Sequence, residues 1–245
     1  MNVLRILAIV TIFAEFILPQ NRWQYPVTPD DPKWLELETL DDIISVQQIP
    51  ENILLQMSTD ELFQAWMDLP GRMEVLAFNS LQQGFNETVK RYNVLRQLLG
   101  RDDVGPIILE EFQKLNIHKM EEETSDEAKG KVISDIGFIE MLLSQPEVLR
   151  TLSTTEKKLC VKKAISMMHN KLSLKSDDRD PFWEDTGVIL MARILKADKY
   201  PEMLDFISLT PAIERSIAHC EYFMNFDTFD VLNEILRIAD NYSSE

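Results

Sequence analysis

A chain of 245 residues in which 45% of the side chains are hydrophobic and 27% are charged can bury a substantial core, and its composition is that of a folded globular protein. The formal net charge of −16 repels nucleic-acid phosphates and anionic lipid headgroups, which excludes both as general partners. With seven glycines and neither an Asn-Gly nor an Asp-Gly dipeptide, the chain lacks the turn signals of a hairpin-rich all-β fold.

Residues 1–18 have the pattern of an export signal. Arg5 stands before the run from Ile6 to Phe13, in which every residue is apolar or small, and Glu15 interrupts the stretch. This run is shorter than the about 20 apolar residues of a membrane-spanning helix. We therefore predict a signal peptide over 1–18, location outside the cell or in the periplasm or cell envelope, and no stable membrane insertion once the signal is removed. The alternative is a buried N-terminal helix of a cytosolic protein.

The segment 19–32 is predicted to be an extended, proline-rich arm. Three prolines fall within seven residues, and each fixes its own φ and disfavours helix in the residue before it. Asp31 followed by Pro32 has the pattern of a helix start, with the aspartate as N-cap and the proline in the first turn. Trp23 and Tyr25 are candidate binding residues in this arm, where they either strap it onto the body or contact a ligand.

One phrase, Pro-Glu-x-Leu-x-x-Leu/Ile-Ser, occurs at 146–153 and at 201–208, and a looser copy with one extra residue covers 50–58. A hydroxyl side chain at or just after the end of each copy can cap a following helix. These capping residues are Ser58, Ser153 and Thr210, the last with Pro211 in the first helical turn. Each copy therefore predicts a short helix, a capped corner and a second helix. A chance resemblance among helix-start signals is the alternative.

Helical periodicity dominates the rest of the chain. Over 155–171, apolar residues recur at helical spacing on one side and polar residues occupy the other, and 72–99 is compatible with one long helix. The sequence predicts an all-α fold, an irregular stack of helical hairpins resembling a degenerate α-solenoid, behind an extended N-terminal arm. We expect 33–245 to form a single helical domain, or two lobes divided near 121–130. Five acids fall in the seven residues 121–127, which we call the acidic connector.

Two charged clusters are candidate binding sites. Asp177 and Asp180, with Trp183 close behind, belong to the densest group of carboxylates outside the acidic connector. This group lacks the glycine and the alternating oxygen ligands of a calcium loop, and a helix start is the simpler interpretation. Lys158 and Lys162 belong to the one basic patch, which either docks an anionic partner or is a solvated helix face.

No pattern predicts a metal or a cofactor. The three histidines are isolated, without the i, i+4 spacing of a zinc pair, and the two cysteines, Cys160 and Cys220, fall among apolar residues at helical spacing. Buried free thiols are the simpler expectation, although export would permit them to pair. We predict no catalytic residue, no metal site and no cofactor.

One set of residues in the first third of the chain carries a family resemblance. These residues are Tyr25-Pro26-Val27-Thr28-Pro29, Ile49-Pro50-Glu51 through Leu54, Met57-Ser58-Thr59 to Leu62, Gly84-Phe85 to Tyr92-Asn93, Leu95, Leu98-Leu99, Arg101 and Asp103. Over this stretch, from Tyr25 to Asp103, the chain resembles a group of uncharacterised, secreted helical proteins from gut Bacteroidetes and Gram-positive spore formers. It implies export and a helical fold. Because no activity is assigned to that group, no functional residue is carried over.

These observations favour an exported, non-enzymatic binding or adaptor protein that presents a helical surface to a peptide or protein partner. The alternative is an extracytoplasmic hydrolase that relies on carboxylates such as Asp177, Asp180, Glu184 and Asp185. A third hypothesis is a cytosolic structural protein. Alanine replacement of the carboxylates would distinguish the first two, because only an enzyme would lose turnover.

Overall fold

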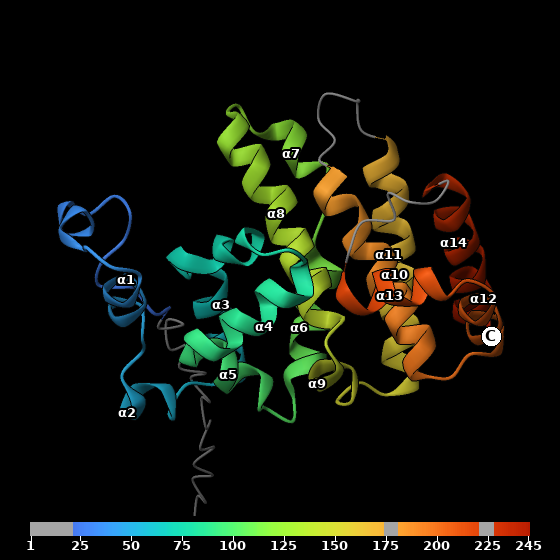
Figure 1. The fold of residues 1–245 in the computed structure, drawn as a ribbon, viewed down its shortest axis with the longest axis horizontal. Helices are drawn as coiled ribbons and strands as arrows, with labels where there is room; N and C mark the ends of the chain where they lie inside the picture. Colours follow the sequence, from blue (N-terminus) through green and yellow to red (C-terminus); the bar gives the residue numbers. More distant parts are fainter. Residues whose placement is uncertain (1–21, 174–180, 221–227) are drawn as a thin grey trace, which may run out of the picture.

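The computed structural model describes residues 22–173, 181–220 and 228–245, and all regular secondary structure in these ranges is helical (Figure 1). The predicted all-α class is confirmed. None of the helices in these ranges combines the length and the apolar character needed to cross a bilayer. The predicted signal peptide over 1–18 lies outside the described residues.

The elements in chain order are η1 (Pro32–Glu36), α1 (Leu40–Val46), α2 (Glu51–Leu54), α3 (Thr59–Met67), η2 (Pro70–Ala77), α4 (Leu81–Arg91), α5 (Asn93–Leu99), α6 (Val104–Lys114), α7 (Lys119–Glu122), α8 (Asp126–Leu143), α9 (Pro146–Leu149), α10 (Thr154–Ser173), α11 (Pro181–Ala197), α12 (Pro201–Leu209), α13 (Pro211–His219) and α14 (Thr228–Ser244), where η denotes a 3-10 helix.

Short polar side chains begin these helices at positions that the sequence predicts. The Asp31 carboxylate accepts a hydrogen bond from the backbone N–H of Lys33 (2.9 Å), with Pro32 in the first turn of η1. Ser58 begins α3 in a reciprocal arrangement. Its hydroxyl accepts from the backbone N–H of Glu61 (3.2 Å), and the Glu61 carboxylate accepts from the backbone N–H of Ser58 (2.7 Å). Both caps satisfy backbone groups that a helix end leaves free.

The first two Pro-Glu phrases form the short helices α2 and α9, and each leads into a capped helix, as predicted. Before α10, the Ser153 backbone N–H donates to the Glu156 carboxylate (2.8 Å), and the Glu156 backbone N–H donates to the Ser153 hydroxyl (3.3 Å). The third phrase departs from this pattern. Thr210 makes no side-chain capping hydrogen bond, so that prediction is wrong, although Pro211 does occupy the first turn of α13. The Thr210 backbone, at φ −137° and ψ 73°, is not in the extended conformation of an N-cap.

The continuous helix predicted over 72–99 is also wrong, because the segment breaks into η2, α4 and α5. The Ser80 hydroxyl accepts from the backbone N–H of Gln83 (3.2 Å) and starts α4 afresh. Tyr92 then separates α4 from α5 with extended backbone, and its buried side chain donates to the Glu74 carboxylate (2.9 Å). Packing of α4 back against η2 outweighs the helical pattern of the sequence.

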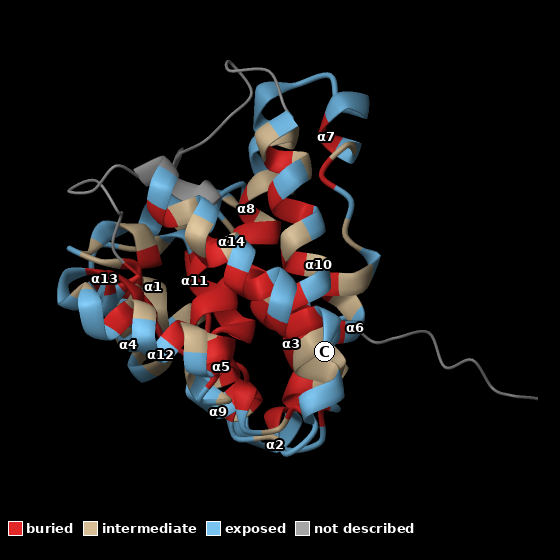
Figure 2. Ribbon diagram, turned by 90° about the vertical axis from the view of Figure 1, so that its right-hand side faces the viewer, coloured by how far each residue is buried: buried red, intermediate tan, exposed pale blue. Residues whose placement is uncertain are grey.

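One hydrophobic cluster joins early and late parts of the described chain, from Tyr25 to Tyr242. At its centre α11 packs against α8, α10 and α14, and α4 contacts α13. Figure 2 shows buried positions concentrated along the inner faces of these helices. The acidic connector is exposed between α7 and α8, where the Ser125 hydroxyl caps α8. Residues on both sides of the connector share the same core.

Candidate functional site

A hollow of about 530 Å³ opens where the short helix α9 meets the starts of α4 and α10 and the ends of α8, α11 and α13. Its apolar lining comes from Pro146, Leu149, Ala197, Ile217 and Ala218. Its cationic lining comes from Arg150, Lys157, Arg193 and Lys196. We refer to this hollow as the cationic pocket. None of the described carboxylates lines it, although the chain as a whole has a net charge of −16.

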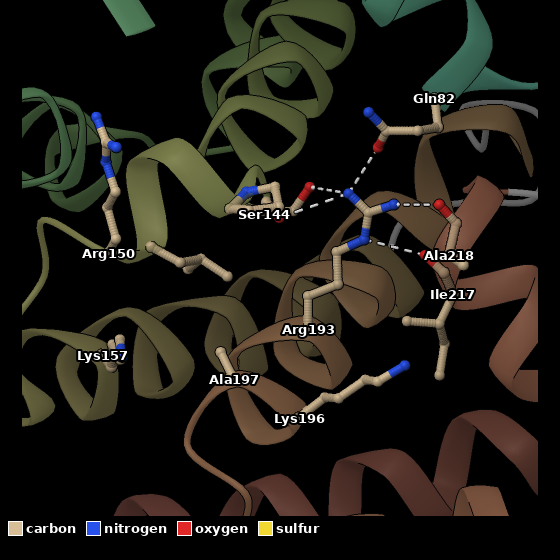
Figure 3. Close-up of a pocket in the computed structure, with 11 residues that line it drawn as sticks. Gln82, Ser144, Arg150, Lys157, Arg193, Lys196, Ala197, Ile217 and Ala218 are labelled. Carbon is tan, nitrogen blue, oxygen red and sulfur yellow. Dashed lines mark hydrogen bonds between the residues drawn. The ribbon is translucent and has the colours of Figure 1, made fainter. Parts of the chain in front are cut away.

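Arg193 of α11 lies at the centre of the cationic pocket and forms hydrogen bonds to three other helices (Figure 3). Its guanidinium donates to the backbone oxygens of Ile217 (3.0 Å) and Ala218 (2.8 Å), in the last turn of α13, and to Ser144 at the end of α8. It also donates to Oε1 of Gln82 on α4 (2.7 Å). The free carbonyls and the negative dipole ends of α8 and α13 stabilise this positive charge.

Burial lowers the pKa of the Arg193 guanidinium from its ordinary value, and the neighbouring Cys220 thiol partly opposes that shift. An arginine nevertheless stays charged at neutral pH. All of the hydrogen bonds described for Arg193 go to uncharged groups, so its charge is not neutralised by a carboxylate.

The other three cations of the pocket differ in their pairing. Lys157 bonds Asp198 and Lys196 bonds Glu214, each at 2.6 Å. Arg150 is exposed, and no described residue pairs with it. The pocket therefore carries two positive charges, on Arg150 and Arg193, that no carboxylate among the described residues balances.

A second, smaller hollow of about 380 Å³ lies beside the first, and Gln82 lines both. Its other lining side chains are mostly uncharged and polar, including Asn79, Gln83 and Asn86. Amide side chains both donate and accept hydrogen bonds, as peptide backbone does. The two hollows together offer an apolar and cationic part followed by an amide-rich part.

The described lining of the cationic pocket combines apolar side chains, cations and hydrogen-bonding groups. Among the described residues no histidine, cysteine or carboxylate lines it, and the Ser144 hydroxyl donates to the backbone oxygen of Met141 (2.8 Å). This part of the lining holds no activated nucleophile or general base of an acyl- or glycosyl-transfer site. An anionic group that carries an apolar body fits both parts of the lining.

Trp23 and Tyr25, the predicted binding residues of the N-terminal arm, pack onto the body at α3. The Tyr25 hydroxyl donates to the backbone oxygen of Ala65 (3.0 Å), and the two aromatic rings meet edge to face with centroids 6.3 Å apart. Burial raises the pKa of the Tyr25 phenol, with Asp68 adding to the shift. The sequence left open whether these side chains hold the arm to the body or contact a ligand, and the structure shows that they hold the arm to the body.

Lys158 and Lys162 lie on α10 and do not line the cationic pocket. The Lys158 ammonium stands over the ring of Tyr242, 5.5 Å from its centroid, and Lys162 is exposed. The structure does not bring these lysines together with Trp23 and Tyr25, which pack at α3.

Asp177 and Asp180 lie outside the described residues. Trp183 belongs to α11, in a stretch for which the structure describes only the backbone. Glu184 and Asp185, the other members of the predicted carboxylate cluster, also belong to α11, and the structure describes only their backbone.

Cys160 and Cys220 are both free and buried. Burial raises the pKa of each thiol, and the nearby carboxylate of Glu140 raises that of Cys160 further. A thiol held protonated is a poor nucleophile and a poor metal ligand. Within the described ranges, no group of three or more His, Cys, Asp or Glu side chains could hold a metal ion.

Sequence reasoning missed Gln82, Arg150, Arg193 and Lys196. A signal existed for Arg193, which is the one charged residue in the otherwise apolar run 188–195 of a buried helix. Such a residue needs a specific set of partners. Arg150 stands inside the repeated Pro-Glu phrase, at a position where the copy at 201–208 has Asp205. This difference in charge between the two copies was the signal for Arg150.

Comparisons of the chain with protein-family models, with curated proteins and with solved structures find no match. The geometry of the pocket is therefore the basis for assigning a function.

Proposed function

We propose that this chain is a non-enzymatic binding or adaptor protein whose cationic pocket takes an acidic segment of a peptide or protein partner. The observation that carries the proposal is that the charge of the pocket lining is opposite in sign to the net charge of the chain. Among the residues that the structure describes, four cations and no carboxylate line an apolar hollow in a protein with a net charge of −16.

Electrostatics favour an anionic partner that also has apolar side chains. Arg150 is exposed and free to meet a carboxylate at the rim, whereas Arg193 lies deeper and supplies positive potential through its fixed position. A charged rim around an apolar centre speeds association and selects partners, while the apolar contacts provide affinity. The amide-lined hollow next to it favours a peptide over a small carboxylate, because amides can bond a peptide backbone.

The experiment is titration of the purified protein with a fluorescent peptide of alternating leucine and glutamate, with the leucine–glutamine peptide as the uncharged comparison. The acidic peptide is expected to bind, and Arg150→Glu is expected to weaken its binding at least about tenfold. Lys119→Glu reverses a positive charge at an exposed position of α7, which does not line the pocket, and it should bind like the parent. Equal weakening by both variants, or equal binding of both peptides, would show that the pocket does not recognise the acidic segment.

We also propose that the protein is exported, on the charge and length pattern of residues 1–18. Intact-mass measurement of natively expressed protein should then give a chain shortened at its N-terminus in the extracytoplasmic fraction. A full-length chain that begins at Met1 in the cytosolic fraction would contradict export without affecting the binding proposal.

A further inference from the structure

Residues 30–46, which we call the acidic arm, stand out from the body of the molecule. They contain η1 and α1, and neither helix has a buried residue. Figure 1 shows this segment in blue at the left end of the longest axis, extending away from the other helices. The acidic arm therefore presents its carboxylates, Leu35 and Leu40 mainly to the surroundings, whereas Ile44 packs against the core.

The charge and apolar content of the acidic arm are unusual for an exposed segment. Six acidic side chains and one basic side chain give it a net charge of −5. The acids are Asp30, Asp31, Glu36, Glu38, Asp41 and Asp42, and the base is Lys33. Leu35 is 87% exposed and Leu40 is 46% exposed, side by side with these acids.

The acidic arm is held in shape although it is exposed. Before it, Tyr25 is anchored to α3, and after it the Gln47 side chain accepts a hydrogen bond from the backbone N–H of Gly71 (2.8 Å). Within it, the Asp31 cap and a reciprocal cap between Thr39 and Asp42 fix the two helical turns. A segment that is ordered before binding loses little conformational entropy when it docks.

The chemistry of the acidic arm complements that of the cationic pocket. The arm offers an exposed leucine flanked by carboxylates, and the pocket offers an apolar lining flanked by cations. The two lie apart on one molecule, because the arm is at the left end in Figure 1 and the pocket helices α10, α11 and α13 are in the right half. One copy therefore presents both surfaces at once to other copies.

We propose that the acidic arm of one copy docks in the cationic pocket of a second copy. This inference rests on the proposed function, since it names the partner segment of the same pocket. Leu35 supplies the apolar anchor, and neighbouring carboxylates such as Glu36 meet Arg150 at the rim. Because the arm and the pocket are different surfaces, the contact is heterologous and joins copies head to tail into chains or rings. Screening of the charges by salt weakens the assembly.

Two variants test this contact on the full chain. The arm variant is Leu35→Ser/Glu36→Lys, and the pocket variant is Arg150→Glu/Ala197→Glu. All four changes are made at residues that are exposed or without a described side-chain partner, so the fold is expected to persist. Sedimentation velocity should show wild-type species that grow with concentration and shrink with added sodium chloride, whereas each variant alone should lose at least about tenfold in association constant.

The decisive measurement is the mixture. Each variant keeps one working surface, so an equimolar mixture of arm variant and pocket variant should form a one-to-one heterodimer and nothing larger. The control variant Lys119→Glu, which reverses one charge outside both surfaces, should assemble like wild type. Recovery of the heterodimer also shows that both variants are folded.

Wild type that stays monomeric up to about 1 mM, or variants that assemble like wild type, would overturn the head-to-tail contact. If the leucine–glutamate peptide still binds such a monomer and Arg150→Glu weakens it, the proposed function stands and the partner is another acidic protein. If that peptide does not bind either, both proposals fail.

Discussion

Gly84 is the residue that lets α4 lie directly against the backbone of η2. A Cβ added there would be 1.9 Å from the backbone oxygen of Val75, a distance that no side-chain movement can relieve. Gly84→Ala is therefore expected to lower the free energy of unfolding by about 1–3 kcal/mol, the usual range for an overpacked site. Urea denaturation followed by circular dichroism measures the change.

Gly130 is the matched control for that substitution. It also lies within a helix, α8, but a Cβ added there would meet nothing within 4 Å. Gly130→Ala should raise the free energy of unfolding by about 0.5–1 kcal/mol, because alanine favours the helix. A loss of stability in both variants would show that close approach to Val75 is not the cause.

A buried ion pair joins Glu140 on α8 to Lys171 on α10. The Glu140 carboxylate on α8 accepts hydrogen bonds from the Lys171 ammonium on α10 (2.6 Å) and from the Thr186 hydroxyl on α11 (2.5 Å), and Glu140 is fully buried. One carboxylate oxygen of Glu140 has no hydrogen-bond partner among the described residues, and it lies close to Gly187. These two hydrogen bonds link α8 to α10 and to α11, at the cost of removing two charges from water.

Lys171→Met leaves the Glu140 carboxylate buried without its ammonium partner. We expect this variant to lose about 3–5 kcal/mol of unfolding free energy, and the double variant Glu140→Leu/Lys171→Met to recover much of that loss. Thermal and urea unfolding of the single and double variants give the coupling between the two side chains. Losses that simply add would mean that the pair is not coupled.

At the scale of the element, the reciprocal cap between Ser153 and Glu156 sets the start of α10 beside the cationic pocket. Two hydrogen bonds, from the Ser153 hydroxyl and the Ser153 backbone N–H, lower the pKa of the Glu156 carboxyl from its ordinary value of 4.5. Since the folded pKa lies below the unfolded one, the stabilisation is fully present above pH 4.5 and is lost as the pH falls through the folded pKa.

Ser153→Ala should therefore cost about 1 kcal/mol of unfolding free energy at pH 7, and the cost should shrink as the pH is lowered below 4.5. The comparison is Glu156→Gln, in which the difference caused by Ser153→Ala should no longer depend on pH in this range. Urea unfolding at a series of pH values measures both. A cost that stays constant with pH in the wild-type background would show that the carboxylate plays no part.

The elements also show which parts of the structure a sequence can predict. The caps of η1, α3 and α10 join residues two or three positions apart, so spacing alone reveals them. On α10, the apolar and polar sides predicted over 155–171 match the observed burial of Val161, Ala164 and Met168. These features depend only on local geometry.

The cationic pocket depends on distant residues and could not be predicted in the same way. Arg193 bonds Gln82, 111 residues away, and Ile217, 24 residues away. The break within 72–99 has the same origin, because it follows from packing of α4 on η2 and not from a helix-breaking residue at Tyr92. Non-local contacts of this kind outweigh local preference.

At the scale of the whole molecule, the shared core predicts cooperative unfolding. The buried cluster includes Trp66 on α3 and Leu190 on α11, from opposite sides of the acidic connector. Hydrogen exchange followed by mass spectrometry in increasing urea should give peptides of α3 and of α11 the same dependence on urea near the transition. Two separate midpoints would instead support two lobes divided near 121–130.

Because contacts anchor the chain on both sides of the acidic arm, a break in the backbone of the arm would not release either piece. Lys33 is the one basic residue between Asp30 and Val46 and is exposed in η1, which makes it the place where trypsin would cut the arm. The N-terminal fragment would remain attached through the packing of Trp23 and Tyr25 onto α3. Cleavage would therefore yield a nicked protein that migrates as one species under native conditions and as two under denaturing ones.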